Sequence, residues 1–274
     1  MTRLAEYRQS RELTVNLVLR ELRSRYKRTA LGYGWSLLSP LASVAIYGVV
    51  FSVFLKVEPP VGDPSGLHSF VLFLVCGLLP WNYFSNCSNA SLDALLANAN
   101  LIRKVYFPRE LLVVSATGAL LVTYLIELGV LCVILVAVGS MVLPWIPVLL
   151  VLVALQAVLV LGVGLALSVL NVYFRDVKHF MILVLMALFY SVPVVYPVTL
   201  VPVERTILGV DVPIRFIYEL NPLVRMIECY RAVLYDLRFP PLGSFLYFAA
   251  SAVVFLVAGL VLFSRMDGRL AEEV

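Results

Sequence analysis

Long stretches of this chain carry no charged residue, and they decide its fold class. Residues 128–174 form an uncharged run of 47 residues, and 36–55 and 239–264 form runs of 20 and 26. A helix needs about 20 apolar residues to cross the hydrocarbon core of a membrane. Only 14% of the chain is charged, against about 25% in soluble domains. The sequence therefore predicts an all-α polytopic membrane protein.

Six transmembrane helices account for the apolar runs. The run 128–174 must hold most of two of them, and the turn-forming segment 139–144 separates the two. No repeat or low-complexity linker divides the chain, so we expect a single membrane domain over 1–274. The expected spans are about 36–56, 68–90, 111–137, 145–171, 179–198 and 243–264.

The basic residues are divided unequally between the two sides of these spans. Cytoplasmic loops of membrane proteins are enriched in Lys and Arg. One set of connecting segments holds fifteen of the 21 basic residues, and the other set holds six. We therefore predict that both termini are cytoplasmic. The inner segments are 1–35, 91–110, 172–180 and 265–274.

The segment 10–28 is predicted to form an amphipathic helix in the inner membrane interface. Its apolar residues recur at helical spacing, and its basic residues lie largely off that stripe. Attraction to anionic lipid explains such a helix, and the alternative is that its basic face helps admit an anionic substrate. The apolar stripe is Val15, Val18, Leu19, Leu22 and Tyr26.

The segment 198–242 is too long for an outer turn and too apolar for a soluble loop. Apolar residues recur at helical spacing from Ile214 to Leu234, but Asn221-Pro222 interrupts them. Proline disfavours the helical conformation in the residue before it. We expect two short re-entrant outer helices before the last span, covered by protein or water at that depth.

Motifs of catalysis and nucleotide binding are missing from the sequence. It has no GxxxxGK[ST], and therefore no P-loop, and it has no HExxH or zinc-type cysteine cluster. We predict neither a metal site nor a cofactor in this chain, which is not expected to be an enzyme. Glu127 is the only carboxylate well inside a span. It is a functional candidate or a hydrogen-bonding partner for a neighbouring helix.

Aromatic residues gather on single faces of three predicted spans. In membranes such residues usually pack or form an interfacial belt. The alternative is a path for sugars, whose C–H faces stack on aromatic planes. The candidates for lining such a channel are Tyr47, Phe51, Phe54, Trp81, Phe84, Phe189, Tyr190 and Tyr196.

Five segments in fixed order carry a resemblance to a known family. Together they resemble the membrane subunits of bacterial ABC exporters of the type-2 permease class, in the branch that exports polysaccharides such as O-antigen, teichoic acid, capsule or galactan. The resemblance covers nearly the whole chain. The segments are RYKRTALGYGWSLLSP (25–40), GLLPWNYF (77–84), NANLIRKVYFPREL (98–111), LNVYFRDVKHF (170–180) and LNPL (220–223).

The resemblance implies a homodimeric channel with two copies of a separate P-loop ATPase on its cytoplasmic side. ATP and Mg would be bound by that partner. The segment 94–108 would be the coupling helix that docks on the ATPase, with a secondary contact in the next inner loop. Arg103 and Lys104 would also anchor the topology. The implied coupling residues are Asn98, Asn100, Arg103, Lys104, Tyr106, Arg175 and Asp176.

The implied substrate is a polyprenyl-pyrophosphate-linked glycan, carried across the bacterial plasma (inner) membrane. Membrane lipids are expected partners, and nucleic acid is not. Charge-assisted hydrogen bonds to the pyrophosphate suit Arg20, Arg23, Arg25, Lys27 and Arg28. The turn from Tyr33 to Trp35 would gate the inner entrance, and the helices around Asn221 and Pro222 would close the outer mouth.

Three other functions stay open on the sequence alone. The first is a drug or small-lipid exporter of the same class. The second is a proton-coupled carrier that uses Glu127 and needs no ATPase. The third is a membrane enzyme acting on polyprenyl lipids, which would need clustered aspartates, whereas those of this chain are scattered.

Overall fold

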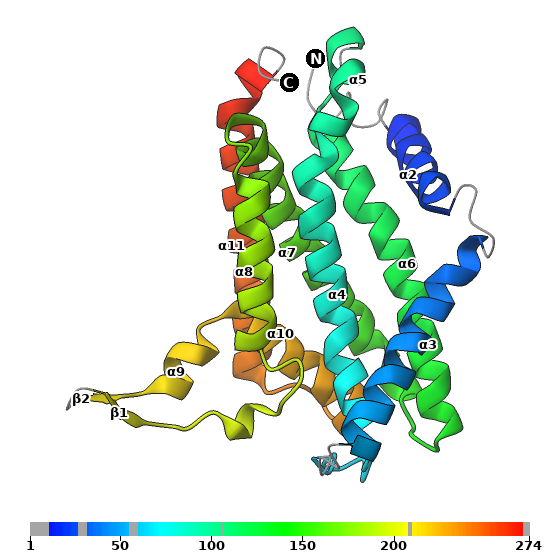
Figure 1. The fold of residues 1–274 in the computed structure, drawn as a ribbon, viewed down its shortest axis with the longest axis vertical. Coiled ribbons are helices and arrows are strands. Elements are labelled where there is room, and N and C mark those ends of the chain that lie inside the picture. Colours follow the sequence, from blue (N-terminus) through cyan, green and yellow to red (C-terminus); the bar gives the residue numbers. More distant parts are fainter. Residues whose placement is uncertain (1–10, 27–31, 55–59, 106, 208–209, 271–274) are drawn as a thin grey trace.

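Helices dominate the computed structural model of the chain, which describes residues 11–26, 32–54, 60–105, 107–207 and 210–270. Successive long helices run in alternating directions between the two ends of the molecule (Figure 1). Four of them are long and apolar enough to cross a membrane. They are α4 (Phe70–Ala94), α6 (Glu110–Ala137), α7 (Ile146–Tyr173, preceded by η4, Leu143–Trp145) and α11 (Leu242–Met266).

The other two expected spans coincide with shorter helices. Residues 36–56 correspond to α3 (Trp35–Gly48), which follows η1 (Gly32–Gly34) and continues into a π-helical segment, η2 (Val49–Phe54). Residues 179–198 correspond to α8 (Val177–Ser191), an apolar helix of 15 residues. Four of the six predicted spans are therefore confirmed as helices of membrane-crossing length. The full count of six, and the side on which the termini lie, stay predictions.

The connecting elements divide between the two ends (Figure 1). The upper end holds α2 (Arg11–Tyr26), η3 (Leu96–Asn98), α5 (Ala99–Lys104) and η7 (Asp267–Arg269). The lower end holds α9 (Ile214–Glu219), α10 (Pro222–Arg231), η6 (Ala232–Asp236) and the short ribbon of β1 (Arg205–Ile207) and β2 (Val210–Val212). The described parts of the segments that we expect in the cytoplasm thus share the upper end.

Glycines allow α7 and α11 to pack backbone against backbone. A Cβ added to Gly259 would lie 2.1 Å from the Gly162 oxygen, and one added to Gly162 would lie 2.4 Å from the Phe255 oxygen. No side chain fits at either position. Small residues at membrane helix interfaces permit such approach. The small residues on the fourth predicted span therefore serve contact within one chain.

Two buried amides of α7 hold α4. The Nδ2 of Asn171 donates to the Leu92 backbone oxygen at 2.8 Å, and the Nε2 of Gln156 donates to the Pro80 backbone oxygen at 2.7 Å. Pro80 itself has no backbone N–H and interrupts the hydrogen-bond ladder of α4. The side chains of α7 thus add polar contacts to the backbone of α4 at two levels.

The lower end confirms the predicted break at Asn221-Pro222. Helix α9 ends at Glu219, and α10 begins at Pro222. The Asn221 side chain accepts a hydrogen bond from the Leu223 N–H at 3.0 Å, as an N-cap does, and proline suits the first helical position. The antiparallel ribbon β1–β2 was not predicted, and within the described residues it is the one departure from the all-α fold.

The predicted N-terminal helix is present as α2, and its apolar stripe packs only partly into this chain, with Val18 and Leu22 half-buried. Leu17, outside that stripe, is the buried residue, whereas Val15 and Leu19 are exposed. Val18 lies near α6, with its Cγ2 3.5 Å from the position of a Cβ on Gly118. The helix therefore contacts α6 and leaves Val15 and Leu19 of its stripe exposed.

Candidate functional site

The upper end presents α5 as a short helix with one buried and one exposed side. Ile102 is buried, whereas Asn100, Arg103 and Lys104 are exposed. Ile102 belongs to a hydrophobic cluster separate from the main core. That cluster joins α2, α4, α5, α6, α7, α11 and the C-terminal segment. Its buried members include Leu17, Leu95, Ile102, Phe107, Val113, Val169, Phe263 and Leu270.

A hydrogen bond connects α2 to η3. The Nη2 of Arg20 donates to the Asn98 Oδ1 at 2.6 Å, and the Asn98 Nδ2 donates to the Ala94 oxygen at 2.8 Å. Both predicted site residues therefore bind within the chain. The bond links the predicted substrate-entrance helix directly to the predicted coupling segment.

Two ion pairs at this end were missed in the sequence because their partners are distant along the chain. The Nζ of Lys178 lies 2.7 Å from the Asp93 Oδ2 and joins α8 to the end of α4. The Nη1 of Arg109 lies 3.2 Å from the Asp267 Oδ1 and joins the start of α6 to η7. The upper ends of four helices are thereby tied together in pairs.

The turn between α7 and α8 exposes the other predicted coupling residues. Arg175 and Asp176 are exposed, and so is the preceding Phe174, at 63%. Arg23 and Trp35 of the predicted entrance are also exposed. Tyr106, Lys27 and Arg28 lie outside the described residues, as do the side chains of Arg25 and Tyr33.

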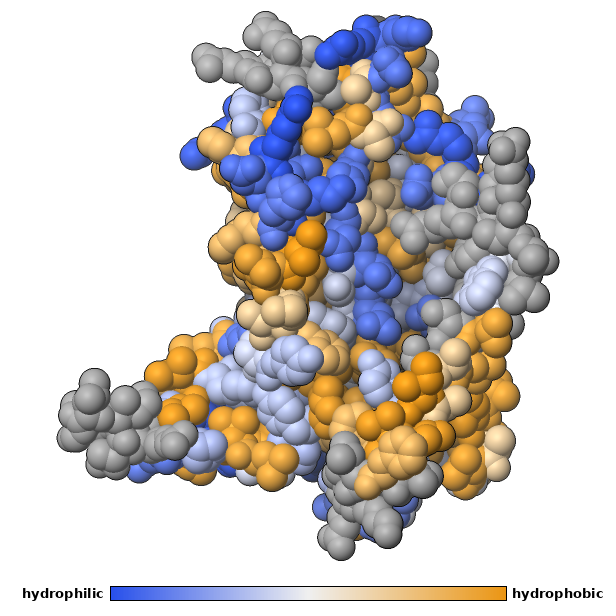
Figure 2. Space-filling view, viewed as in Figure 1, coloured by the Kyte–Doolittle hydropathy of each residue, from blue (hydrophilic) through white to orange (hydrophobic). Residues whose placement is uncertain are grey.

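A groove of about 330 Å³ lies between α4 and α8. We call it the α4–α8 groove. It contains three of the predicted channel aromatics together with polar side chains of α4. Figure 2 shows a hydrophilic band that descends from the upper end along the middle of this face, between apolar surfaces. The groove is lined by Trp81, Ser85, Asn89, Ile182, Leu185, Met186, Phe189 and Tyr190.

The predicted channel aromatics have different environments. Trp81 and Phe189 pack together with ring centroids 5.7 Å apart, and Tyr190 is 69% exposed. Phe84 and Trp81 are only 5% and 4% exposed and pack against each other, which favours a packing role for both. The Tyr196 hydroxyl donates a hydrogen bond to the Tyr190 backbone oxygen at 2.9 Å.

The predicted aromatic face on α3 and η2 is only partly occupied by packing. Tyr47 and Phe51 are half-buried, and the Phe51 ring lies 4.8 Å from that of Phe70 at the start of α4. Phe54, at the end of η2, is exposed. The two residues nearer the middle of the span therefore pack, and the third stands clear of this chain.

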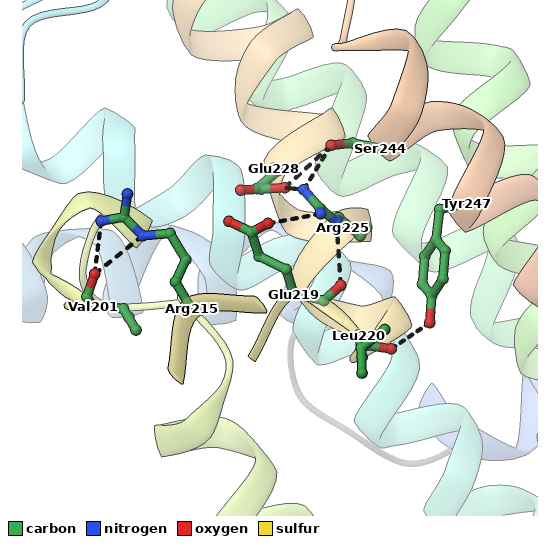
Figure 3. Close-up of polar contacts among 8 residues, drawn as sticks. All are labelled: Val201, Arg215, Glu219, Leu220, Arg225, Glu228, Ser244 and Tyr247. Carbon is green, nitrogen blue, oxygen red and sulfur yellow. Dashed lines mark hydrogen bonds and ion pairs between the residues drawn. The ribbon is translucent and has the colours of Figure 1, made fainter. Parts of the chain in front are cut away.

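Charged residues brace the lower end (Figure 3). The guanidinium of Arg225 lies 2.8 Å from the Glu219 carboxylate and 3.2 Å from that of Glu228, and it donates to Ser244 at 3.0 Å. This node joins α9, α10 and α11. Burial raises the pKa of Glu228, and the charge of Arg225 opposes the rise. Tyr247 also donates from α11 to the Leu220 oxygen.

A buried arginine holds the turn after α8 against α4. The guanidinium of Arg231 lies 3.6 Å from the centroid of the Phe73 ring. It donates hydrogen bonds to the backbone oxygens of Val194 at 2.7 Å and Tyr196 at 3.1 Å. A cation over a ring in a dry site contributes about 2 kcal/mol. Arg231 therefore fixes the turn after α8 next to the helices that we expected to close the outer mouth.

No cluster of three or more His, Cys, Asp or Glu that could hold a metal ion occurs among the described residues. Glu127 is half-buried in α6.

Comparisons with known proteins show sequence similarity over most of the chain. The sequence profile of the family described as "ABC-2 type transporter" matches residues 12–235. The chain is 30% identical to "O-antigen export system permease protein RfbA" of Klebsiella pneumoniae, over 95% of this chain and 94% of the relative. A protein of the same name from Myxococcus xanthus is 30% identical over 98% of both chains. "Polysialic acid transport protein KpsM" of Escherichia coli is 26% identical over 92% of both. The resemblance indicated by the five motifs is confirmed, and the chain belongs to the ABC-2 type transporter family.

Proposed function

We propose that this chain is the membrane subunit of an ATP-driven exporter that moves a polyprenyl-pyrophosphate-linked polysaccharide out of the bacterial cytoplasm. Two copies form the channel in the inner membrane, and two copies of a P-loop ATPase bind ATP and Mg below it. The names of these relatives support polysaccharide over drugs or small lipids as cargo. The missing P-loop supports a separate ATPase.

The observation that carries the ATPase docking site is the two-sided environment of α5. Its buried side sits in a cluster shared with most of the other helices, so a push on α5 reaches them through packed side chains. Its exposed side offers polar and basic groups to a partner. Exposed Phe174 and Arg175 on the next inner turn widen the surface.

The substrate's pyrophosphate enters at α2 in this account. Arg20 and Arg23 are exposed and supply cationic donors suited to phosphate oxygens. The bond between Arg20 and Asn98 supports coupling between the entrance and α5, because a pyrophosphate that drew Arg20 away would release Asn98. The exposed Val15 and Leu19 of α2 suit contact with lipid.

Charge reversal on α5 tests the docking role. The double variant Arg103→Glu and Lys104→Glu should lower both ATPase co-purification and glycan export by at least about 10-fold, if each lost contact is worth about 1 kcal/mol. The amount of chain in the membrane should not change. Arg238→Glu at the opposite end is the matched control, since Arg238 is exposed there. Normal export by the double variant would refute the docking role of α5.

A further inference from the structure

Helix α4 carries a continuous row of polar side chains on one face. Asn82, Ser85, Asn86 and Asn89 follow one another at i, i+3, i+4 and i+7, and Asp93 is at i+11. Residues at this spacing share one side of a helix. All five are half-buried or exposed, although most of α4 is buried. We call this row the α4 polar stripe.

The stripe is electrically neutral along its whole length. Four members are amides or a hydroxyl, and Asp93 is paired with Lys178 by contacts of 2.7 and 2.9 Å. The stripe borders the α4–α8 groove, to which it contributes Ser85 and Asn89. The residues that line this groove are aromatic, aliphatic or uncharged polar. A molecule in the groove therefore meets no formal charge until it reaches the upper end.

Lipid is a poor neighbour for such a surface. Moving an amide or hydroxyl from water into an apolar medium without a hydrogen-bond partner is unfavourable. The Nδ2 of Asn89 donates one hydrogen bond to the Ser85 backbone oxygen at 3.0 Å. The second N–H and the oxygen of this amide can still bind another molecule. The stripe therefore favours contact with a molecule that both donates and accepts hydrogen bonds.

A hydroxyl-rich, uncharged chain meets that requirement. Each sugar hydroxyl donates and accepts, as amides do, and the C–H faces of sugar rings suit the aromatic side of the groove. A polyanionic chain would instead be recognised by guanidinium or ammonium groups, which form the stronger charge-assisted bonds. The groove supplies none of these.

We propose that the α4 polar stripe and the α4–α8 groove form a track for an uncharged, hydroxyl-rich glycan and disfavour polyanionic chains. Asn82, Ser85, Asn86 and Asn89 supply the hydrogen bonds, and Phe189 and Tyr190 supply the stacking surface. Trp81 is only 4% exposed and supports the Phe189 ring from behind. The inference rests on the proposed export function, which it deepens by naming the charge class of the cargo.

Cysteine labelling tests whether the stripe contacts water. Cys76, Cys87 and Cys229 are buried, so a Cys132→Ala variant keeps only buried native thiols and should show little labelling of its own. Ser85→Cys and Asn89→Cys are compared with Val133→Cys on α6, which is 70% exposed and lies on an apolar face. Because a thiol reacts as the hydrated thiolate, an uncharged maleimide should label the stripe on the order of 10-fold faster than position 133. Equal rates would overturn the track, as would Asn86→Cys forming a disulfide between two copies.

Protection by oligosaccharides tests the charge preference. A short dextran oligosaccharide should slow labelling of Asn89→Cys several-fold, and dextran sulfate of the same length should not. Adding Ser85→Lys should reverse this preference. Equal protection by both probes, or by neither, would refute the assignment. Labelling needs neither ATP nor a partner, so absence of an ATPase would refute the exporter without changing these results.

Discussion

The crossing of α7 and α11 gives the sharpest stability prediction. In Gly259→Ala the new Cβ would lie 2.1 Å from the Gly162 oxygen, more than 1 Å closer than ordinary contact. The clash is with backbone on both sides, so no side chain can rotate away. The two helices must separate or bend at this point.

The cost follows from the contacts that separation weakens. A gap of 0.5–1 Å loses about a quarter to a half of an atom pair's dispersion energy of ~0.1–0.2 kcal/mol. With about 40 affected pairs, the loss is about 1–4 kcal/mol, which matches the usual penalty of overpacking. A loss of 2–3 kcal/mol lowers Tm by about 5–10 °C in a chain of this size.

Gly129→Ala is the matched control. Gly129 also lies within a long apolar helix, but an added Cβ there meets no atom within 4 Å. Helix propensity then favours alanine by up to about 1 kcal/mol. Thermal unfolding of the detergent-solubilised protein, followed by tryptophan fluorescence, should show a lower Tm for Gly259→Ala and an equal or higher one for Gly129→Ala. Equal Tm values for the two variants would refute the close crossing.

Three further predictions concern polar contacts. Gln156→Leu removes the donor to the Pro80 oxygen and should lower the free energy of unfolding by about 1–2 kcal/mol, measured by denaturant titration. Arg225→Met leaves two carboxylates without their cation and should speed hydrogen exchange in α9, whereas Arg238→Met at a more exposed pair should change stability by less than about 1 kcal/mol. Asn221→Ala removes a helix cap and should cost about 1 kcal/mol in the same titration, and Asn221→Asp should restore most of it.

Local patterns in the sequence predicted local structure well. The uncharged runs identified the spanning helices, Pro222 located the start of α10, and the segment 139–144 located the turn before α7. These features depend on nearby residues, so a single sequence contains them. The spacing of the α4 polar stripe is also present in the sequence, but it is easily overlooked because the rest of that segment is apolar.

Contacts between distant residues could not be predicted in the same way. Asp93 pairs with Lys178, and Arg20 with Asn98, only because the helices that carry them lie side by side. Similarly, Phe84 is buried because other helices surround it, which the aromatic pattern within α4 does not reveal. The ribbon β1–β2 has strands of only three residues, too short for a period-two pattern to stand out.

Native mass spectrometry of the tagged chain, gently solubilised from its own membranes, tests the central claim most directly. The account predicts one assembly that holds two copies of this chain and two copies of a P-loop ATPase, and loss of the ATPase from the Arg103→Glu, Lys104→Glu variant. An intact, export-competent chain that never carries an ATPase would contradict it and would make a proton-driven cycle at Glu127 the leading explanation.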